Sequence, residues 1–425
     1  MDIPRRRFLG LAGLAVASVA GLSACGSNTG RPESETSPTS SGAKPQLTQW
    51  YHEYGEEGVE DAVKRYAAAY PDATVTVKWN PGDYGKLLST ALLTADVPDV
   101  FETENGPSLD MIKAGQVEDL TELIGDAKSQ FSAPVLAAMS WQDKIYAIPQ
   151  TVDMQLLYYR KSVLEKAGVQ PPTTLDELTT VAKKVATDDM GGFFAGNDGG
   201  IGVLSQMLIW AAGQEMIDAG QTTIGFDNEA GYAALAAFAE LYRSGGMLKS
   251  ASADWYDAAP FANGETAMQW GGLWSLPDIQ KAWKDDFGVL PFPAIGSAGK
   301  QAVPFGAFGS TVAAKGKNPE AAKAFVKWLW IDNEDDQVDF SNSYGTHIPA
   351  KPALVSRADK IASGPGAEAA KFVNELGHAA DKLWTAAISQ AMTAAVSNVA
   401  TKKANPKSEI GDVAAVAKKE IARVK

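Results

Sequence analysis

The order of hydrophobic and polar positions after residue 45 predicts strands and helices that alternate along the chain. Residues 46–51 are predicted to form a strand, and the segment 58–70 places Val59, Val63 and Tyr66 at helical spacing. The first six predicted elements are a strand at 46–51, a helix at 58–70, a strand at 75–79, a helix at 84–94, a strand at 98–102 and a helix at 111–123. This order predicts a parallel sheet covered on both faces, so a ligand is expected beside the loops at 50–54 and 102–106, where strands end.

The rest of the chain predicts a mixed α/β part and a helical end. Two β-rich runs at 144–149 and 154–159 surround residues 150–153, where we expect the chain to cross between two lobes. The sequence Thr174-Leu-Asp-Glu177 is a capping box, so a helix is predicted from Leu175 to about residue 187. The other predicted elements are a helix around Val163 and Leu164, helices at 203–211, 227–242, 319–330, 367–375, 380–400 and 410–424, a strand at 309–314, and short strands with glycine turns within 261–293.

The first 45 residues have the features of an export signal followed by a tether. Arg5 to Arg7 precede Phe8 and Leu9, and the apolar stretch at 10–20 is too short to span a bilayer. Arg-Arg-x-Phe-Leu resembles a twin-arginine signal, which implies export of a folded chain, and a Sec signal with an arginine-rich start fits the same residues. Leu22-Ser-Ala-Cys25-Gly resembles a bacterial lipobox, which implies cleavage after residue 24 and lipidation of Cys25. We expect a signal peptide at 1–24 and a lipidated, disordered tether at 25–45, because this stretch is rich in Ser, Thr, Gly and Pro.

Composition narrows the classes of ligand and partner. The chain has 425 residues, enough for two domains, with a formal net charge of −13 and 11 Trp. The acidic balance argues against a nucleic-acid partner and favours a neutral ligand over an anionic one. The single Cys excludes an intramolecular disulfide, and the three His are scattered without zinc-ligand spacing. Neither a metal site nor a cofactor is predicted.

Several short motifs occur in a fixed order along the chain. They are Tyr70-Pro71, Pro98-Asp-Val, Tyr146-Ala-Ile-Pro149, Tyr158-Tyr-Arg-Lys, Pro171-Pro-Thr-Thr, Gly264-Glu-Thr-Ala-Met268, Gly271-Gly-Leu-Trp274 and Lys317-Asn-Pro-Glu-Ala-Ala-Lys-Ala-Phe325. In this order, behind a lipobox, they resemble the family-1 extracellular solute-binding proteins of ABC importers, the group that includes maltose-binding protein. The resemblance covers nearly the whole chain, and Arg160 departs from the Asn that is usual at its position.

The resemblance implies a two-lobed α/β fold of the periplasmic-binding-protein type II class, with a hinge and a ligand cleft between the lobes. We expect lobe 1 at 46–151 plus 309–347 and lobe 2 at 152–308 plus 348–425. A carbohydrate ligand would close the lobes, and the closed form would deliver it to the permease subunits of an ABC transporter. The protein is then expected to be a monomer without catalysis of its own, held by its lipid anchor at the outer face of the bacterial cytoplasmic membrane.

Candidate ligand-binding residues are aromatic and polar side chains in or beside predicted loops, because sugars present apolar faces and many hydroxyls. The resemblance implies five positions: Glu104, Asn105, Asp153, Trp274 and Trp384. The residues themselves add ten further candidates: Trp50, Tyr51, His52, Glu53, Asp83, Tyr84, Trp210, Trp270, Phe308 and Tyr344. Core packing, a helix cap or a hinge hydrogen bond is the structural alternative for each of them.

Three other functions stay open at this point. A binding protein of the same fold could take a non-sugar small polar solute. A secreted glycoside hydrolase would also pair carboxylates with aromatic side chains, but no sequence feature fixes such a pair. The sequence has no Gly-x-Ser-x-Gly, His-Glu-x-x-His or phosphate-binding glycine loop that would indicate other hydrolytic or nucleotide chemistry. An adhesive lipoprotein would show no change in tryptophan fluorescence with any ligand.

Overall fold

The computed structural model describes residues 44–54, 56–94, 96–343 and 346–425. The predicted signal peptide, Cys25, nearly all of the predicted tether and Tyr344 lie outside the described residues. Their assignments remain predictions. None of the helices within the described ranges is both long and apolar enough to cross a bilayer.

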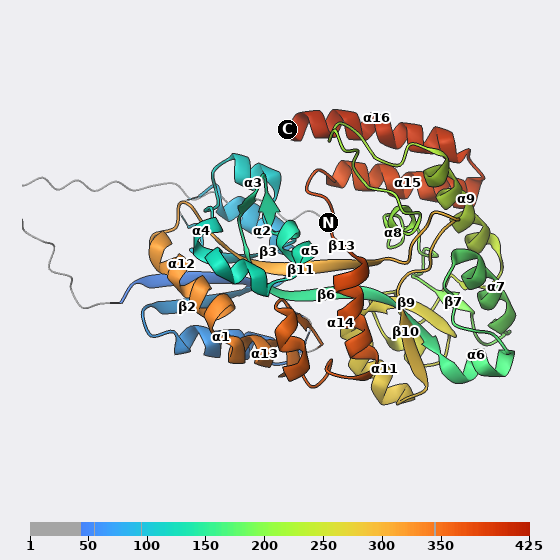
Figure 1. Ribbon diagram of the computed structural model, residues 1–425, viewed down its shortest axis with the longest axis horizontal. Coiled ribbons are helices and arrows are strands. Elements are labelled where there is room, and N and C mark those ends of the chain that lie inside the picture. The colour runs from blue at the N-terminus through green and yellow to red at the C-terminus, as the bar shows by residue number, and fades with distance from the viewer. Residues whose placement is uncertain (1–43, 55, 95, 344–345) are drawn as a thin grey trace, which may run out of the picture. The chain divides into compact units, whose positions relative to one another are not determined.

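Three parallel strands with two helical connections form one end of the main sheet (Figure 1). The elements are, in chain order, β1 (Gln46–His52), α1 (Val59–Ala69), β2 (Thr74–Asn80), α2 (Tyr84–Ala91) and β3 (Val100–Glu104). β2 and β3 flank β1, and both run parallel to it. Helix α1 buries Val59, Val63 and Tyr66, which share one face because of their helical spacing. The predicted βαβαβ start of the chain is confirmed.

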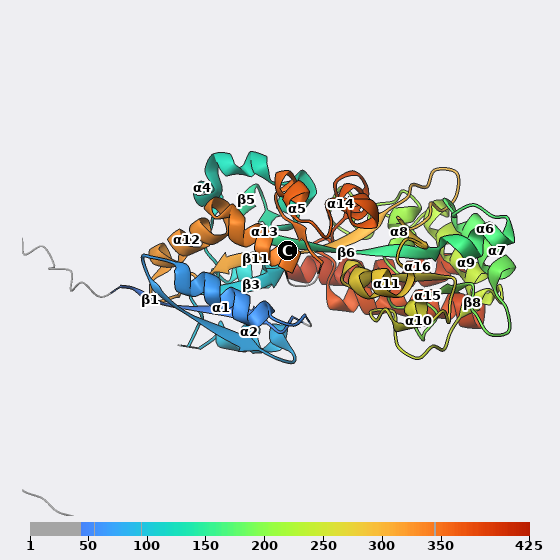
Figure 2. The same cartoon turned by 90° about the horizontal axis from the view of Figure 1, so that it is seen from below.

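The sheet continues through two long strands, β6 (Ile148–Arg160) and β11 (Val303–Val312). β11 lies between β3 and β6 and is antiparallel to both, and Figures 1 and 2 show β6 and β11 side by side through the middle of the sheet. The two β-rich runs predicted at 144–149 and 154–159 are wrong at their junction, because β6 continues through it. Polar residues fit inside this strand because the buried Gln150 amide pairs with the Ser310 hydroxyl of β11 at 2.9 Å.

The other end of the sheet contains both antiparallel and parallel strand pairs. β6 pairs antiparallel with β9 (Met268–Gly272) and β10 (Phe287–Leu290), and β9 leads through β7 (Phe193–Phe194) to β8 (Met247–Leu248). Helices packed around this end are α6 (Lys161–Ala167), α7 (Leu175–Val185), α9 (Glu229–Arg243), α15 (Ala386–Lys402) and α16 (Pro406–Val424). The predicted capping box of α7 is confirmed, because the Glu177 amide donates to Thr174 Oγ1 at 3.2 Å and the Thr174 amide donates to the Glu177 carboxylate at 3.1 Å.

Some predicted boundaries are wrong for local reasons. The helix predicted at 111–123 is two helices, α3 (Leu109–Lys113) and α4 (Thr121–Ile124), because Gly115 adopts a left-handed φ of 61° just after the first. α15 begins after residue 380, since β13 (Gly377–His378) pairs with β11 and Thr385 caps the helix through its side chain. The helix predicted at 203–211 is only α8 (Met207–Ala211).

The remaining elements are η1 (Gly125–Gln130), α5 (Ala133–Ala138), β4 (Ser140–Trp141), β5 (Lys144–Ile145), α10 (Ala259–Ala262), η2 (Leu273–Ser275), α11 (Leu276–Trp283), α12 (Pro319–Lys327), the π-helical turn η3 (Trp328–Asp332), α13 (Glu334–Ser343), β12 (Ile348–Pro349), η4 (Pro352–Arg357) and α14 (Gly364–Leu376). Among them, β4 and β5 form a separate two-stranded sheet, and β12 pairs with β6.

Buried side chains form separate hydrophobic clusters along the sheet. One cluster draws on residues 47–148 and 312–350, and another draws on 157–302 and 383–424 together with Leu109. A third lies along β6 and β11 and includes residues of α11 and α14. This third cluster combines residues of both predicted lobes, so the clusters do not mark where one lobe ends. The predicted lobe boundaries stay a prediction.

Candidate ligand-binding site

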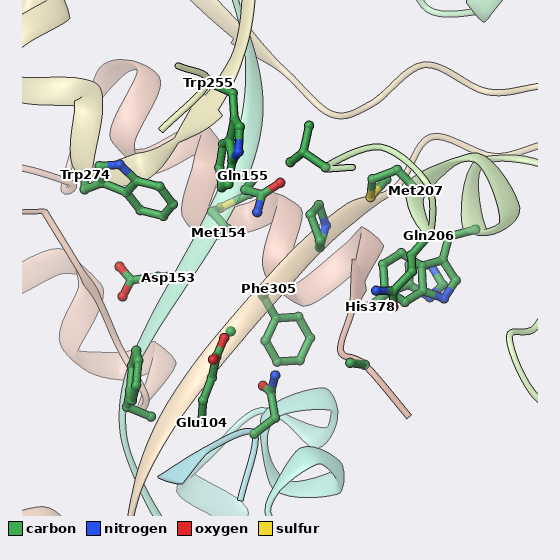
Figure 3. Close-up of a pocket in the computed structure, with 17 residues that line it drawn as sticks. Glu104, Asp153, Met154, Gln155, Gln206, Met207, Trp255, Trp274, Phe305 and His378 are labelled. Carbon is green, nitrogen blue, oxygen red and sulfur yellow. The ribbon is translucent and has the colours of Figure 1, made fainter. Parts of the chain in front are cut away.

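A cavity of about 400 Å³ opens where the end of β3 meets the middle of β6 and β11, a size typical of small-molecule sites. Its other walls come from the turn after β9, from the segment around α8 and from residues 378–380 after α14. Six predicted site residues line it: Glu104, Asn105, Asp153, Trp210, Trp274 and Phe308. Figure 3 labels Glu104, Asp153 and Trp274 among the side chains around the cavity.

Two carboxylates reach the cavity from strands on either side of β11. Glu104 stands opposite Phe308 of β11, and Asp153 of β6 stands opposite Gly306 of the same strand. A Cβ atom on Gly306 would come within 2.8 Å of Glu104 Oε1, so the Glu104 side chain lies over this glycine. Burial raises the pKa of Glu104, and the nearby Asp153 carboxylate raises this pKa further, whereas His52 opposes the shift.

A buried histidine holds Asp153 from behind the cavity. Its Nδ1 atom lies 2.7 Å from Asp153 Oδ1, and Nε2 of the same residue, His347, lies 3.4 Å from Glu56 Oε1. Burial lowers the pKa of His347, but the two carboxylates outweigh burial and raise this pKa above its usual value. Among the described residues nothing donates to the other oxygen, Asp153 Oδ2, which is left for a ligand.

The backbone places the amide side chain of Asn105 at the cavity rim. Asn105 has a φ of 54°, its amide donates to the Ala307 carbonyl at 2.7 Å, and its Oδ1 accepts from the Ala307 amide at 3.0 Å. The Lys382 Nζ atom donates to the Asn105 carbonyl at 2.7 Å and to the Pro107 carbonyl at 3.3 Å. Burial lowers the pKa of Lys382 to about 8. With its oxygen occupied, Asn105 offers its Nδ2 donor to the cavity.

Aromatic side chains form the apolar walls. Trp274 lies in η2, and its Nε1 donates to the Tyr256 carbonyl at 2.8 Å while its ring meets Trp255 nearly edge-on at 6.1 Å. On the other side of the cavity, Trp210 stacks on His378 at 5.2 Å with an interplanar angle of 17°. Rings on both sides of a polar floor can contact the apolar faces of a ring-shaped ligand.

The amino-acid sequence matches the family described as bacterial extracellular solute-binding protein over residues 45–329, which is more than half of the chain. The chain belongs to this family. Known relatives of this solute-binding protein include the galactooligosaccharide-binding protein of Bacillus subtilis (strain 168), 23% identical over 420 residues that cover 94% of each chain. The maltodextrin-binding protein MdxE of the same strain is 26% identical over 356 residues, which cover 80% of each.

Solved structures share the fold of this solute-binding protein. The GacH receptor of Streptomyces glaucescens superposes with a TM-score of 0.74 at 24% identity, covering 90% of this chain and 100% of that one. The sugar-binding protein MalE from Xanthomonas citri superposes with a TM-score of 0.75 at 18% identity, covering 89% and 98%. The predicted two-lobed, periplasmic-binding-protein-like α/β fold is confirmed.

Three predicted aromatic residues of this solute-binding protein lie in the core instead of lining the cavity. Tyr51 and Trp270 have an exposed fraction of 0%, so in this conformation they have no surface for a ligand. Tyr51 points to the core side of β1, and Trp270 donates from Nε1 to Gln155 Oε1 at 2.7 Å. Trp384 is 9% exposed and packs beside Phe226 in the cluster under α15.

The remaining candidates near β1 and β2 also lie off the cavity. Trp50 is half-buried beneath the Lys78 ammonium, and the Tyr84 hydroxyl donates to the Glu102 carbonyl at 3.1 Å. Two loop acids are exposed: Asp83 caps α2 by accepting from the Lys86 amide, and Glu53 follows β1.

His52 supports the cavity wall from behind. Its ring stacks on Phe308 at 4.5 Å, and its Nδ1 lies 2.8 Å from the buried Glu102 carboxylate. Burial lowers the pKa of His52, but Glu102 outweighs burial and raises this pKa. His52 therefore holds Phe308 in place without lining the cavity itself.

Several cavity residues were missed from the sequence: Met154, Gln155, Val203, Gln206, Met207, Trp255, Pro304, Phe305, Gly306, His378 and Ala380. Gln155 could have been predicted from the sequence, because it lies two residues after Asp153 and side chains two residues apart on a strand share a face. The segments around Trp255 and His378 carry no motif, and only the tertiary fold brings them to β6 and β11. Within the described residues no group of three or more His, Cys, Asp or Glu could hold a metal ion.

Proposed function

We propose that this protein captures a sugar or oligosaccharide in the cavity and delivers it to the permease of an ABC transporter. The observation that carries the proposal is the combination of tryptophan rings on both sides of the cavity with polar groups between them that lack protein partners. Glu104 accepts no hydrogen bond from the described residues, and the side-chain nitrogens of Asn105 and Gln155 donate none within them. Sugar rings offer apolar faces for the former and hydroxyls for the latter.

Relatives support this ligand class. The galactooligosaccharide-binding protein and MdxE of Bacillus subtilis are named for sugars, as is MalE of Xanthomonas citri. These relatives are binding proteins, so we propose that the chain has no catalysis of its own. Incubation with candidate oligosaccharides should return them intact, and release of shorter products would instead favour a glycoside hydrolase that uses the two cavity carboxylates.

A thermal-shift screen against monosaccharides and α- and β-linked oligosaccharides tests the proposal. A ligand at a concentration 100 times its dissociation constant should raise the free energy of unfolding by about 2.7 kcal/mol. Ala380→Trp places a bulky ring at an exposed cavity residue and should abolish the shift, whereas Ala68→Trp, at an exposed position on α1, should retain it. If only amino acids, phosphate or metal ions stabilise the protein, its ligand is one of these solutes and not a sugar. If no solute stabilises it, the proposal is rejected.

We propose that the protein is a monomer held at the outer face of the cytoplasmic membrane through acyl chains on Cys25. A Cys25→Ser variant, labelled with a palmitate analogue in cells, should lose both the label and its place in the membrane fraction. Retention of the label would reject Cys25 as the site of attachment.

Ligand capture is proposed to close two lobes, 46–151 plus 309–347 against 152–308 plus 348–425, about a hinge. Small-angle scattering should then show a smaller radius of gyration with the ligand that the thermal-shift screen identifies. An unchanged radius with bound ligand would reject closure.

A further inference from the structure

The cavity is acidic, and its lining contains no strong base. Glu104 and Asp153 supply two carboxylates, and the described lining residues include neither Lys nor Arg. The one basic side chain among them, His378, has its pKa lowered by burial and is stacked on Trp210. His378 is therefore uncharged at neutral pH, and the charge that this lining can carry comes from the two carboxylates.

Both carboxylates keep unused acceptor capacity. In the part of the chain that the structure describes, no amide or side chain donates to Glu104, and Asp153 uses only Oδ1, towards His347. A glutamate without a partner beside a second carboxylate is unfavourable, since each charge disfavours the other. A hydroxyl can donate to such oxygens, but it leaves the repulsion between the two charges in place.

Gly306 is what allows the two carboxylates to share this space. Glu104 and Asp153 come from strands on opposite sides of β11, and the Glu104 carboxylate lies where a side chain on Gly306 would be, 2.8 Å from the position of its Cβ. Any other residue at 306 would push Glu104 aside.

Three tryptophans complete an environment suited to a cation. Trp210, Trp255 and Trp274 all line the cavity, and indole faces attract ammonium groups. Gln206 adds a buried side-chain oxygen, Oε1, that has no partner among the described residues. An ammonium has three donors and no acceptor, which matches two carboxylates. Gln206 lies on the opposite side of the cavity from Asp153 (Figure 3), where its oxygen is available to another donor of the ligand.

We propose that the physiological ligand is an amine-bearing sugar, a free amino sugar or an oligosaccharide of amino sugars, whose ammonium lies between Glu104 and Asp153. This inference rests on the proposed function, and it narrows the ligand from sugars in general to cationic ones. It also accounts for the absence of Lys and Arg from the described lining, because either would repel the ligand.

Matched ligands separate this inference from sugar binding as such. Calorimetry at about pH 7 leaves the sugar amine largely protonated and, because burial raises the pKa of Glu104, ionises this carboxylate more completely than a more acidic buffer would. The pairs are glucosamine with glucose, galactosamine with galactose, mannosamine with mannose, and β-1,4-linked glucosamine dimers and trimers with their N-acetylated forms. In at least one pair the amine should bind about tenfold tighter or better, the gain from a charge-assisted hydrogen bond.

If a neutral sugar binds as tightly as its amine counterpart, or only neutral sugars bind, the inference is wrong while the proposed function stands. If no sugar of either kind binds, both are wrong.

Variants then identify the groups. Glu104→Gln should weaken binding of the amine ligand about tenfold more than it weakens binding of the neutral counterpart, because glutamine still accepts from a hydroxyl but carries no charge. Gly306→Ala, which displaces the carboxylate without removing it, should have the same effect. Glu122→Gln, an exposed glutamate on α4, is the control for lost charge and should leave both affinities unchanged.

A stability measurement guards against a merely structural effect. Because the pKa of Glu104 is raised in the folded state, its ionised form disfavours folding at neutral pH, so Glu104→Gln should raise the melting temperature. Weaker binding together with a higher melting temperature would show that the affinity is lost through a missing ligand contact and not through a damaged fold. Equal weakening of the amine and neutral ligands would show that Glu104 recognises hydroxyls and would overturn the inference.

Discussion

Removal of the Trp274 indole should weaken carbohydrate binding far more than it weakens the fold. A sugar stacked on one face would cover roughly 100 Å² of the 150–250 Å² that an aromatic side chain can bury. At about 25 cal/mol per Å² this contact is worth about 2.5 kcal/mol, so Trp274→Ala should raise the dissociation constant about 70-fold. Isothermal calorimetry with the best ligand of the thermal-shift screen measures this change directly.

A glycine two residues earlier provides a second test that keeps the indole. A Cβ atom on Gly272 would lie 2.2 Å from Cε2 and Cζ2 of Trp274, although the backbone there, with φ −86° and ψ 161°, suits alanine. Gly272→Ala must therefore move the ring without straining the strand. We expect a loss of affinity close to that of Trp274→Ala, together with a shift in tryptophan emission.

A tryptophan outside the cavity lining serves as the matched control. Trp283 of α11 donates to the Phe261 carbonyl at 3.0 Å and lies under the Arg160 guanidinium at 3.3 Å, away from the cavity lining. Trp283→Ala should lower the melting temperature and leave affinity within about twofold, because it removes a cation–π contact and no ligand contact. The reasoning fails if Trp274→Ala binds sugar normally, or if its melting temperature falls as far as that of Trp283→Ala.

Three further variants test groups that position the site or the fold. Lys382→Met removes a donor to the Asn105 carbonyl. The pKa of Lys382 is about 8 in the folded chain and 10.5 in the unfolded chain, so the free energy of unfolding of the wild type rises with pH between these values. Denaturation between about pH 8 and 10.5 should therefore show the wild type gaining stability relative to the variant. His347→Gln should lower the free energy of unfolding most at about pH 5. The reason is that protonated His347 beside Asp153 stabilises the folded state below about pH 6.5, and this stabilisation is lost as the pH rises through the raised pKa of the folded state. Equal destabilisation at about pH 8 would contradict this. Thr174→Ala should lower the free energy of unfolding by about 1 kcal/mol in urea titrations, and no change would mean that the capping box is energetically silent.

Local patterns predicted the fold where side-chain periodicity and backbone agree. Val59, Val63 and Tyr66 mark α1 because they repeat on one helical face, and Thr174 with Glu177 marks the start of α7 because both caps are made locally. The pattern failed inside β6, where polar Gln150 suggested a break. Its partner, Ser310, lies on a strand far along the sequence, so no local signal could show that the amide is satisfied.

The site was predicted to the extent that it follows strand ends. Glu104 and Asp153 lie on the cavity because β3 and β6 carry them to the same region of the sheet. Tyr51 and Trp270 also lie on strands of this sheet, but their side chains face the core. Their neighbours along these strands do not line the cavity either, so the distance of the strand segment from the cavity, which the sequence does not show, decides the outcome. Trp255 lies in a loop whose position depends on contacts with other elements, which composition does not encode.

The pairing of β3 with β11 sets a constraint on synthesis. β3 ends at Glu104 and β11 begins at Val303, so at 5–20 residues per second roughly 10 to 40 s separate their emergence from the ribosome. During that interval the nascent chain carries an unpaired strand edge, which is a template for aggregation. A product truncated before Val303 is expected to be insoluble, and the parallel strands at the N-terminus depend on a segment translated much later.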